Sequence, residues 1–233
     1  MSEVHPRVVA ALNTQLARWR AALDRGERRI GWKLGLNVAE VEAVIGRDPV
    51  IGHLTSGSLL ATGQSYSAHR GAHLRAETEV ALVIGHAVAA DASPDDARAA
   101  IVGAAVALEI VDVRRPPDDL EGIVIENVFH RAFVLGPARS VDLRRSEGRL
   151  MVNGNLRASA TAGEDHAGVV RAVAQLLGAV GEQLQRGDQI LSGALTHVAI
   201  EPGDAITAEI PTLGAVSLAI SRDTPRPPSM GAD

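Results

Sequence analysis

Two carboxylates stand two residues apart in the stretch RAETEVALVIG, residues 75–85. The apolar residues that follow them predict a buried strand over residues 77–84. Because side chains alternate across a strand, Glu77 and Glu79 should point to the same face, with Cβ atoms roughly 7 Å apart. Like charges on one face repel each other unless something positive lies between them, so the pair raises the question of which positive group that would be.

A third carboxylate, Glu109, lies in the apolar segment VALEIVDV. A buried carboxylate is costly unless it is paired or binds a metal. Three glutamates would form an all-oxygen site, which suits Mg²⁺ or Mn²⁺. Spacing alone leaves another interpretation open, in which Glu77 and Glu79 face solvent and Glu109 pairs with Arg114 or Arg75.

Lys33, in the stretch GWKLGL, is the next candidate for chemistry. Its neighbours on the same strand face, Gly31 and Gly35, leave room beside the lysine for something to approach. This pattern favours a cation that reaches into a pocket, and a solvated strand lysine is the alternative. The histidines give a weaker signal, because His69 and His73 are four residues apart but flank a glycine typical of a turn.

The elements that must position these side chains follow from periodicity and from turn and cap signals. Helices are predicted over residues 6–25, 38–46 and 164–184 and within 92–106, with Ser93 as N-cap and Pro94 at the first helical position. Strands are predicted over residues 28–37, 77–84, 107–114, 127–136, 149–161, 188–195, 205–211 and 215–221, whereas 47–64 is predicted to be a loop. Asn153 and Gly154 predict a hairpin turn. The mixture predicts an α+β fold with a mixed, curved sheet.

The composition narrows the possible functions. The 233 residues carry a net charge of −5 and only 2% aromatic residues, which argues against nucleic-acid binding. The absence of cysteine excludes disulfides, thiolate metal sites and cysteine nucleophiles. No apolar run reaches the roughly 20 residues of a membrane span, and the amphipathic N-terminus lacks the features of a secretory signal. We therefore expect a soluble cytoplasmic protein with no nucleic-acid or membrane partner.

Five stretches, in this order, resemble the fumarylacetoacetate hydrolase superfamily, and most closely its 2-keto-4-pentenoate hydratase and 4-oxalocrotonate decarboxylase branch. They are GWKLGL (31–36), RAETEVALVIG (75–85), ALEIVDVR (107–114), AFVLG (132–136) and GDQILSGAL…IEPGD (187–204). The resemblance implies a rolled, mixed β-sheet with flanking helices, like the C-terminal domain of that family, and assembly as a homo-oligomer. We expect an N-terminal helical segment over residues 1–29, a catalytic domain over 30–222 and a disordered tail over 223–233.

The resemblance also implies roles for individual residues. Glu77, Glu79 and Glu109 match the family's metal-binding acids, and Lys33 matches its pocket lysine. The backbone N–H of Leu34 would face the carboxylate of the substrate. The metal, Mg²⁺ or Mn²⁺, would stabilise the enolate of a 2-oxo acid. Lys33 would shuttle a proton if its surroundings lower its pKa.

Several positions depart from the branch around the expected substrate tail. Ser192 stands where the family usually has Thr, and either hydroxyl can donate to a carboxylate oxygen. Residues 126–129 read ENVF where the branch has a sequence like DNAS, so Asn127 and Phe129 would line the tail, with a ring in place of a hydroxyl. Gly57 stands near the position of an expected acid. The bulk of Phe129 predicts preference for a monoacid over a dicarboxylate.

The implied activity is that of a metal-dependent lyase of aromatic catabolism, most like 2-keto-4-pentenoate hydratase, acting on a 2-oxo acid or its 2-hydroxydienoate enol. A decarboxylase like 4-oxalocrotonate decarboxylase is one alternative. Another is C–C hydrolysis of an acylpyruvate, which would need a pair such as His53 with Glu40 or Glu42. The last is a non-catalytic relative that binds a small 2-oxo acid.

Overall fold

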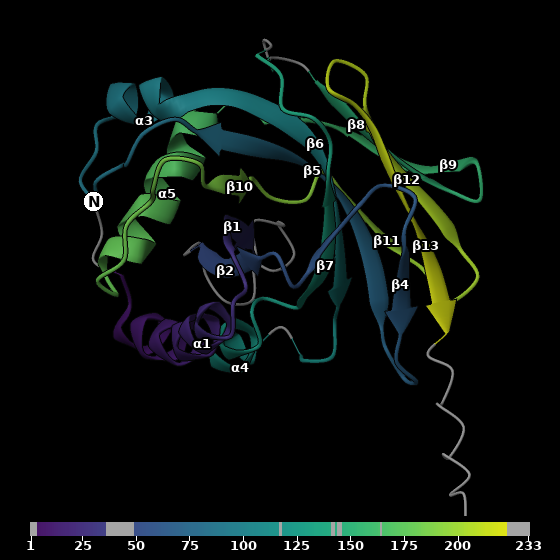
Figure 1. Cartoon of the computed structure of the whole chain (residues 1–233), viewed down its shortest axis with the longest axis horizontal. Coiled ribbons are helices and arrows are strands. Elements are labelled where there is room, and N and C mark those ends of the chain that lie inside the picture. The colour runs from purple at the N-terminus through teal and green to yellow at the C-terminus, as the bar shows by residue number, and fades with distance from the viewer. Residues whose placement is uncertain are drawn as a thin grey trace, which may run out of the picture.

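Two β-sheets and four helices make up the computed structural model of the chain (Figure 1), which describes residues 4–35, 49–116, 118–140, 143, 146–163 and 165–222. The larger sheet curls round on itself. The helices cover its outer side on the left of the view, and the smaller sheet covers it on the right. No helix in the described part of the chain is both long and apolar enough to span a membrane.

The larger sheet has eight strands in the order β2-β1-β10-β5-β6-β7-β3, with β11 paired to the other end of β5. Its strands are β1 (Arg29–Gly35), β2 (Val50–Thr55), β3 (Leu59–Leu60), β5 (Leu74–Ile84), β6 (Ile101–Asp112), β7 (His130–Leu135), β10 (Gln189–Leu191) and β11 (Thr196–Ala199). The pairs β1–β10 and β3–β7 are parallel and the others antiparallel, so the sheet is mixed, as predicted.

The smaller sheet has five strands in the order β4-β13-β12-β8-β9. They are β4 (Ser65–Ala68), β8 (Glu147–Val152), β9 (Asn155–Thr161), β12 (Ala205–Ile210) and β13 (Gly214–Arg222). Asn153 and Gly154 join β8 to β9 with φ angles of 53° and 77°. Both residues therefore adopt the left-handed conformation of a tight hairpin turn, as their types predict.

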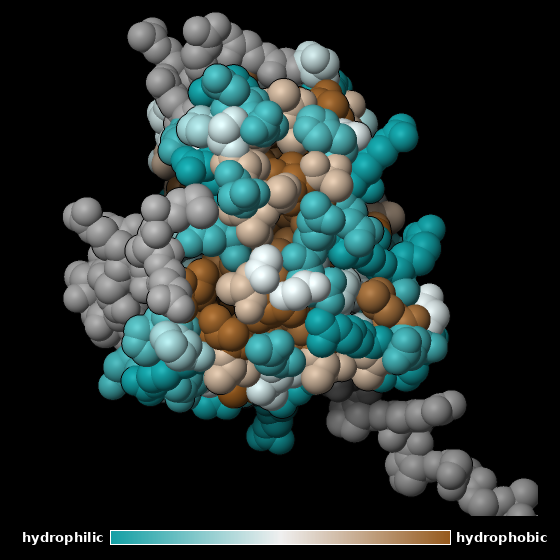
Figure 2. All heavy atoms as spheres, turned by 90° about the vertical axis from the view of Figure 1, so that its left-hand side faces the viewer, coloured by the Kyte–Doolittle hydropathy of each residue, from teal (hydrophilic) through white to brown (hydrophobic). Residues whose placement is uncertain are grey.

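Four helices are described: α1 (Pro6–Asp24), α3 (Pro94–Ala100), α4 (Leu120–Ile125) and α5 (His166–Gly178). The Ser93 side chain caps α3 as predicted, with Pro94 at its first position. Helix α1 packs on β2 and α4, and the ring centroids of Trp19 in α1 and Trp32 in β1 lie 5.2 Å apart. Figure 2 shows this helical side of the molecule, where apolar side chains gather between polar ones.

The two faces of the curled sheet carry different side chains. The outer face contributes Trp32, Leu82 and Leu108 to the main core. The inner face carries a second, smaller apolar cluster, which comprises Leu54, Ala81, Ala105, Ala107, Phe133 and Leu191. Because three of its six members are alanines, the inner face leaves space for longer polar side chains farther along the same strands.

Three predicted elements were wrong. The helix that begins at Pro94 ends at Ala100, because residues 101–112 pair with β5 as strand β6. Residues 47–64 were expected to be a loop but contain β2 and β3, which the sheet recruits as edge strands. Residues 127–129 precede β7 instead of belonging to it. The helix expected over 38–46 and the tail over 223–233 lie outside the described residues.

Candidate metal centre

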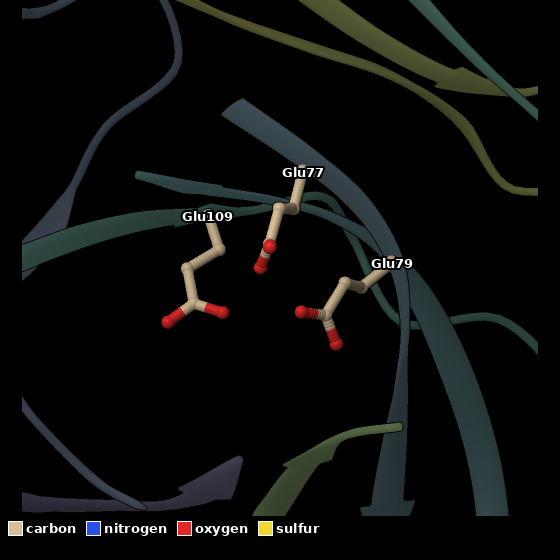
Figure 3. Close-up of side chains that lie close together, drawn as sticks. All are labelled: Glu77, Glu79 and Glu109. Carbon is tan, nitrogen blue, oxygen red and sulfur yellow. The ribbon is translucent and has the colours of Figure 1, made fainter. Parts of the chain in front are cut away.

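Strand pairing brings the three predicted carboxylates together on the inner face of the sheet. Glu77 of β5 stands directly opposite Glu109 of β6, and Glu79 follows two residues later on the same face. One carboxylate oxygen of each lies within 4.8 Å of the other two, and the three side chains converge in Figure 3. All three residues are buried, at 8%, 1% and 0% exposure for Glu77, Glu79 and Glu109. The solvent-facing alternative is therefore excluded, and Arg114 pairs with Asp112 instead.

The two oxygens of Glu109 have different surroundings. Oε1 accepts hydrogen bonds from Lys33 Nζ and from His130 Nδ1, each at 2.7 Å. Oε2 is buried and has no hydrogen-bond partner among the described residues. A buried carboxylate oxygen without a partner is costly. An orphaned oxygen beside two further carboxylates fits a hard divalent cation, which prefers oxygen ligands.

The other two carboxylates are each anchored through one oxygen as well. Oε1 of Glu77 lies 2.5 Å from Nδ1 of His197 in β11. Oε2 of Glu79 accepts a hydrogen bond of 2.8 Å from the backbone N–H of Gly193, whose φ of 110° suits glycine. The stretch from Gly193 to His197 thus orients two of the acids, whereas Lys33 and His130 orient the third.

Burial and neighbouring charges shift the pKa values of Glu79, Glu109 and Lys33 in different directions. Burial raises the pKa of Glu79 well above its usual value, and the charges of Glu109 and Glu77 raise it further. Burial opposes ionisation of Glu109 too, but Lys33 and His130 lower its pKa to about 2. A divalent ion would therefore replace a proton that Glu79 holds readily, because metal ligands must be deprotonated.

Lys33 lies in the site, buried between Glu109 and the backbone oxygen of Val128, which accepts a hydrogen bond of 3.2 Å from Nζ. Burial alone would lower the pKa of Lys33, but Glu109 and the two other acids outweigh it and raise the pKa. The lowered pKa on which proton shuttling depended is therefore not found. The room that Gly31 and Gly35 were expected to leave is filled by the protein itself. A Cβ at Gly35 would overlap the Val128 side chain, and one at Gly31 would overlap the Gln189 backbone.

A left-handed turn before β7 builds one wall of the site. Asn127, Val128 and Phe129 have φ angles of 60°, 52° and 65°, which cost non-glycine residues roughly 1–2 kcal/mol each. The turn presents the Val128 oxygen to Lys33. It also lets the Asn127 side chain accept from the backbone N–H of His53 at 2.7 Å and donate to its oxygen at 3.0 Å.

The other predicted substrate residues make no side-chain hydrogen bond with the three acids in the described part of the chain, and the structure places them as follows. The Leu34 side chain belongs to the main core, next to Lys33 in the chain. Ser192 is half-buried just after β10, and its backbone N–H donates to the Val80 oxygen at 3.0 Å. Phe129 packs against the main core. Their contacts with a substrate, and those of Asn127, stay predictions.

His130 and Ser58 are site residues that sequence reasoning missed. His130 lies against Glu109, and its Nε2 is 2.9 Å from Ser58 Oγ. Neither residue shows a ligand spacing in the sequence, because the contact depends on the left-handed turn.

His53 faces α1, since it stands opposite Trp32 in the β1–β2 pair. Its Nδ1 lies 3.3 Å from Gln15 Oε1. Burial, with a smaller effect of His130, lowers the pKa of His53 to about 3. Glu40 and Glu42, its suggested partners, lie outside the described residues.

Comparison with known proteins identifies relatives along most of the chain. The family model described as fumarylacetoacetate (FAA) hydrolase C-terminal matches residues 33–221. A 4-oxalocrotonate decarboxylase of Pseudomonas sp is 29% identical over 205 residues, which are 84% of this chain and 80% of that protein. The 2-keto-4-pentenoate hydratase 1 of Dechloromonas aromatica is 30% identical over 221 residues, covering 85% and 80%.

A solved structure confirms the predicted rolled-sheet fold. The 4-oxalocrotonate decarboxylase from Pseudomonas putida G7, complexed with calcium and acetate, superposes with a TM-score of 0.80 at 25% identity. The match covers 91% of this chain and 85% of that one.

Proposed function

Because the chain belongs to the fumarylacetoacetate hydrolase family, we propose that it is a divalent-metal-dependent lyase that acts on a 2-oxo acid or its 2-hydroxydienoate enol, most like a 2-keto-4-pentenoate hydratase. The chain is an enzyme of the kind represented by its hydratase and decarboxylase relatives. The choice of reaction within that group, the cytoplasmic location, the homo-oligomer and a role in aromatic catabolism are parts of the proposal.

The buried carboxylate cluster carries the proposal. Glu77, Glu79 and Glu109 would hold Mg²⁺ or Mn²⁺, and the partnerless Oε2 of Glu109 supports this assignment. The related decarboxylase crystallised with calcium and acetate also combines a divalent ion with a carboxylate. When bound, the ion supplies Lewis-acid chemistry, which favours negative charge on the 2-oxo oxygen of a substrate.

The protein's own groups would bind and orient the substrate around the cluster. Lys33 Nζ, kept charged by the three acids, would attract the negative charge that develops in the reaction. The Leu34 N–H and the Ser192 hydroxyl would hold the substrate carboxylate. The packed apolar cluster on the inner face excludes water from the sheet interior next to the acids.

Charge around the site favours a monoacid substrate. Among the described residues, Lys33 is the only lysine or arginine in an ion pair with the three glutamates, and it is already engaged by Glu109. Among these described residues, a second carboxylate on the substrate would lose water without gaining a charged partner, which costs several kcal/mol. With Phe129 beside Asn127 at the expected tail position, hydration is favoured over decarboxylation of a diacid.

Two other functions keep specific support. A decarboxylase reaction is favoured by the relative at 29% identity that bears that name. A non-catalytic relative would keep the metal site but lose turnover, and the departure at residues 126–129 is its support. An acylpyruvate hydrolase has less support, because Nδ1 of His53, the histidine that its catalytic pair would need, lies against Gln15.

Calorimetric titration of Mn²⁺ and Mg²⁺ tests the metal site. The wild type should bind one ion per chain, and Glu109→Ala should bind at least tenfold more weakly because it removes a ligand. Glu201→Gln, which changes an exposed glutamate in a turn, is the matched control and should bind like the wild type. Equal affinity in the wild type and Glu109→Ala would refute the site.

Turnover of 2-hydroxypenta-2,4-dienoate and of a 2-oxo-3-enedioate, side by side with Mg²⁺, tests the reaction. Faster hydration of the monoacid is expected. Faster turnover of the diacid would assign the decarboxylase reaction, and no turnover of either by metal-loaded protein would favour the non-catalytic alternative.

A further inference from the structure

A chain of hydrogen bonds leads from the turn after β2 to the carboxylate cluster. The Ser58 hydroxyl oxygen lies 2.9 Å from Nε2 of His130, and Nδ1 of His130 lies 2.7 Å from Oε1 of Glu109. His130 is 6% exposed and Glu109 is fully buried. Both ring nitrogens are therefore engaged by protein atoms.

The charge of Glu109 determines the direction of these hydrogen bonds. Ionised Glu109 can only accept, so Nδ1 of His130 carries the proton and donates it. Nε2 of a neutral ring protonated at Nδ1 is an acceptor, so the Ser58 hydroxyl donates to it in preference to the Thr55 oxygen, which is 3.3 Å away.

The arrangement fixes which oxygen of Glu109 is free. Lys33 and His130 both donate to Oε1, and Oε2 is left without a partner among the described residues. Lys33 alone would fix the carboxylate poorly, because its ammonium ends a flexible stem. The His130 ring is rigid, held by Ser58 and packed against Phe133 with ring centroids 5.6 Å apart.

We propose that Ser58 and His130 are positioning residues of the metal centre, which hold Glu109 so that Oε2 alone faces the ion and thereby set the affinity for it. The proposal rests on the metal-dependent function argued above. Neither residue is a ligand here: His130 uses Nδ1 for Glu109 and Nε2 for Ser58, and the Ser58 hydroxyl contacts that ring. Partners of this kind typically change metal affinity 10–100-fold when removed.

Mn²⁺ titration of three variants and one control variant tests the proposal. His130→Leu removes both hydrogen bonds and should weaken binding roughly 10–100-fold. His130→Asn places an amide N–H where Nδ1–H was, and should recover most of that loss. Ser58→Ala leaves Glu109 untouched but frees the ring, and should weaken binding about fivefold, the size expected of one neutral hydrogen bond.

The matched control is Ser56→Ala, the same change two residues away in the same turn. The Ser56 hydroxyl accepts from the backbone N–H of Arg28 and has no contact with His130. It should leave the Mn²⁺ affinity unchanged. If Ser58→Ala and His130→Asn both bind as the wild type does and His130→Leu, when folded, does too, the positioning role is refuted while the metal site stands.

A second measurement does not need the metal. In protein without added metal that is labelled with ¹⁵N-histidine, the His130 ring, assigned by its loss in His130→Asn, should carry a proton on Nδ1. An Nδ1 without a proton would overturn the proposal, because Glu109 would then face a lone pair. If the wild type binds no Mn²⁺ at all, the proposed function fails, and the tautomer alone decides whether the hydrogen-bond chain exists.

Discussion

Replacing Lys33 with methionine should separate metal binding from turnover. Methionine keeps much of the length and apolar volume of the lysine stem, but it removes the charge that lies 2.7 Å from Glu109 Oε1. The acids then remain buried with His130, His197 and backbone groups as their partners. The metal-free protein should therefore lose stability, whereas the metal-loaded protein has a divalent charge to offset the acids.

The magnitude follows from the burial of both partners. Lys33 is 3% exposed and Glu109 fully buried, so removal of one partner should cost about 3–5 kcal/mol. For a chain of this size that is a fall of roughly 6–20 °C in the melting temperature of the metal-free protein. Loss of a neighbouring positive charge should also tighten Mg²⁺ binding, by roughly tenfold or more. Turnover should nevertheless fall by roughly 10²–10⁴, the range of a lost catalytic group.

The assay is thermal unfolding of both proteins with and without Mg²⁺, together with calorimetry. Mg²⁺ should raise the melting temperature of Lys33→Met more than that of the wild type. Because the chain has one lysine, ¹⁵N-lysine labelling gives a single side-chain signal, which should stay that of an ammonium up to and beyond the usual lysine pKa. The reasoning is refuted if metal-free Lys33→Met melts with the wild type, or if Mg²⁺ stabilises both equally.

Three further predictions concern the surrounding residues. Gly52→Ala places a Cβ 2.8 Å from Asn127 Oδ1 and 2.9 Å from Lys33 Cγ, and should cost about 1–3 kcal/mol in urea unfolding, whereas Gly163→Ala, with nothing within 4 Å, should cost less than 1 kcal/mol. Asn127→Ala loses two hydrogen bonds and keeps the left-handed strain, so it should be less stable than Asn127→Gly by about 1 kcal/mol in the same assay. The pKa of His53 is lowered to about 3, so the buried neutral ring contributes fully to folding stability above pH 6.5, and this contribution falls as the pH drops toward 3. Between pH 6.5 and 5 the wild type should lose up to about 2 kcal/mol of unfolding free energy that His53→Gln retains.

The metal cluster could be predicted because it depends on strand periodicity. Alternation placed Glu77 and Glu79 on one face, and the apolar neighbours of Glu109 indicated burial. The register that puts Glu109 opposite Glu77 is set by tertiary structure. Antiparallel pairing of two buried strands nevertheless leaves only a few residues on the same face that could stand opposite Glu109. The resemblance supplied the link between the two strands that periodicity could not.

The rest of the site depends on features that local sequence patterns do not encode. Three consecutive left-handed residues with Val and Phe among them run against backbone preference, so the sequence favoured a strand over 127–129. That error hid His130. If residues 127–129 continued the strand and Phe129 faced the site, alternation would turn His130 to the opposite face. In the same way, β2 was missed because its short sequence, VIGHLT, lies in a stretch that proline and glycine punctuate and that therefore resembles a loop.

The buried charges explain why metal binding and stability should be linked in this protein. Three carboxylates on the inner face of the sheet oppose one another, and without an ion they are offset by Lys33, by hydrogen bonds and by a proton that Glu79 holds readily. The left-handed turn adds strain at the same place. Residues that lower the stability of the metal-free fold are therefore the ones that create affinity for a divalent ion, and binding energy from the ion should return part of that stability to the folded state.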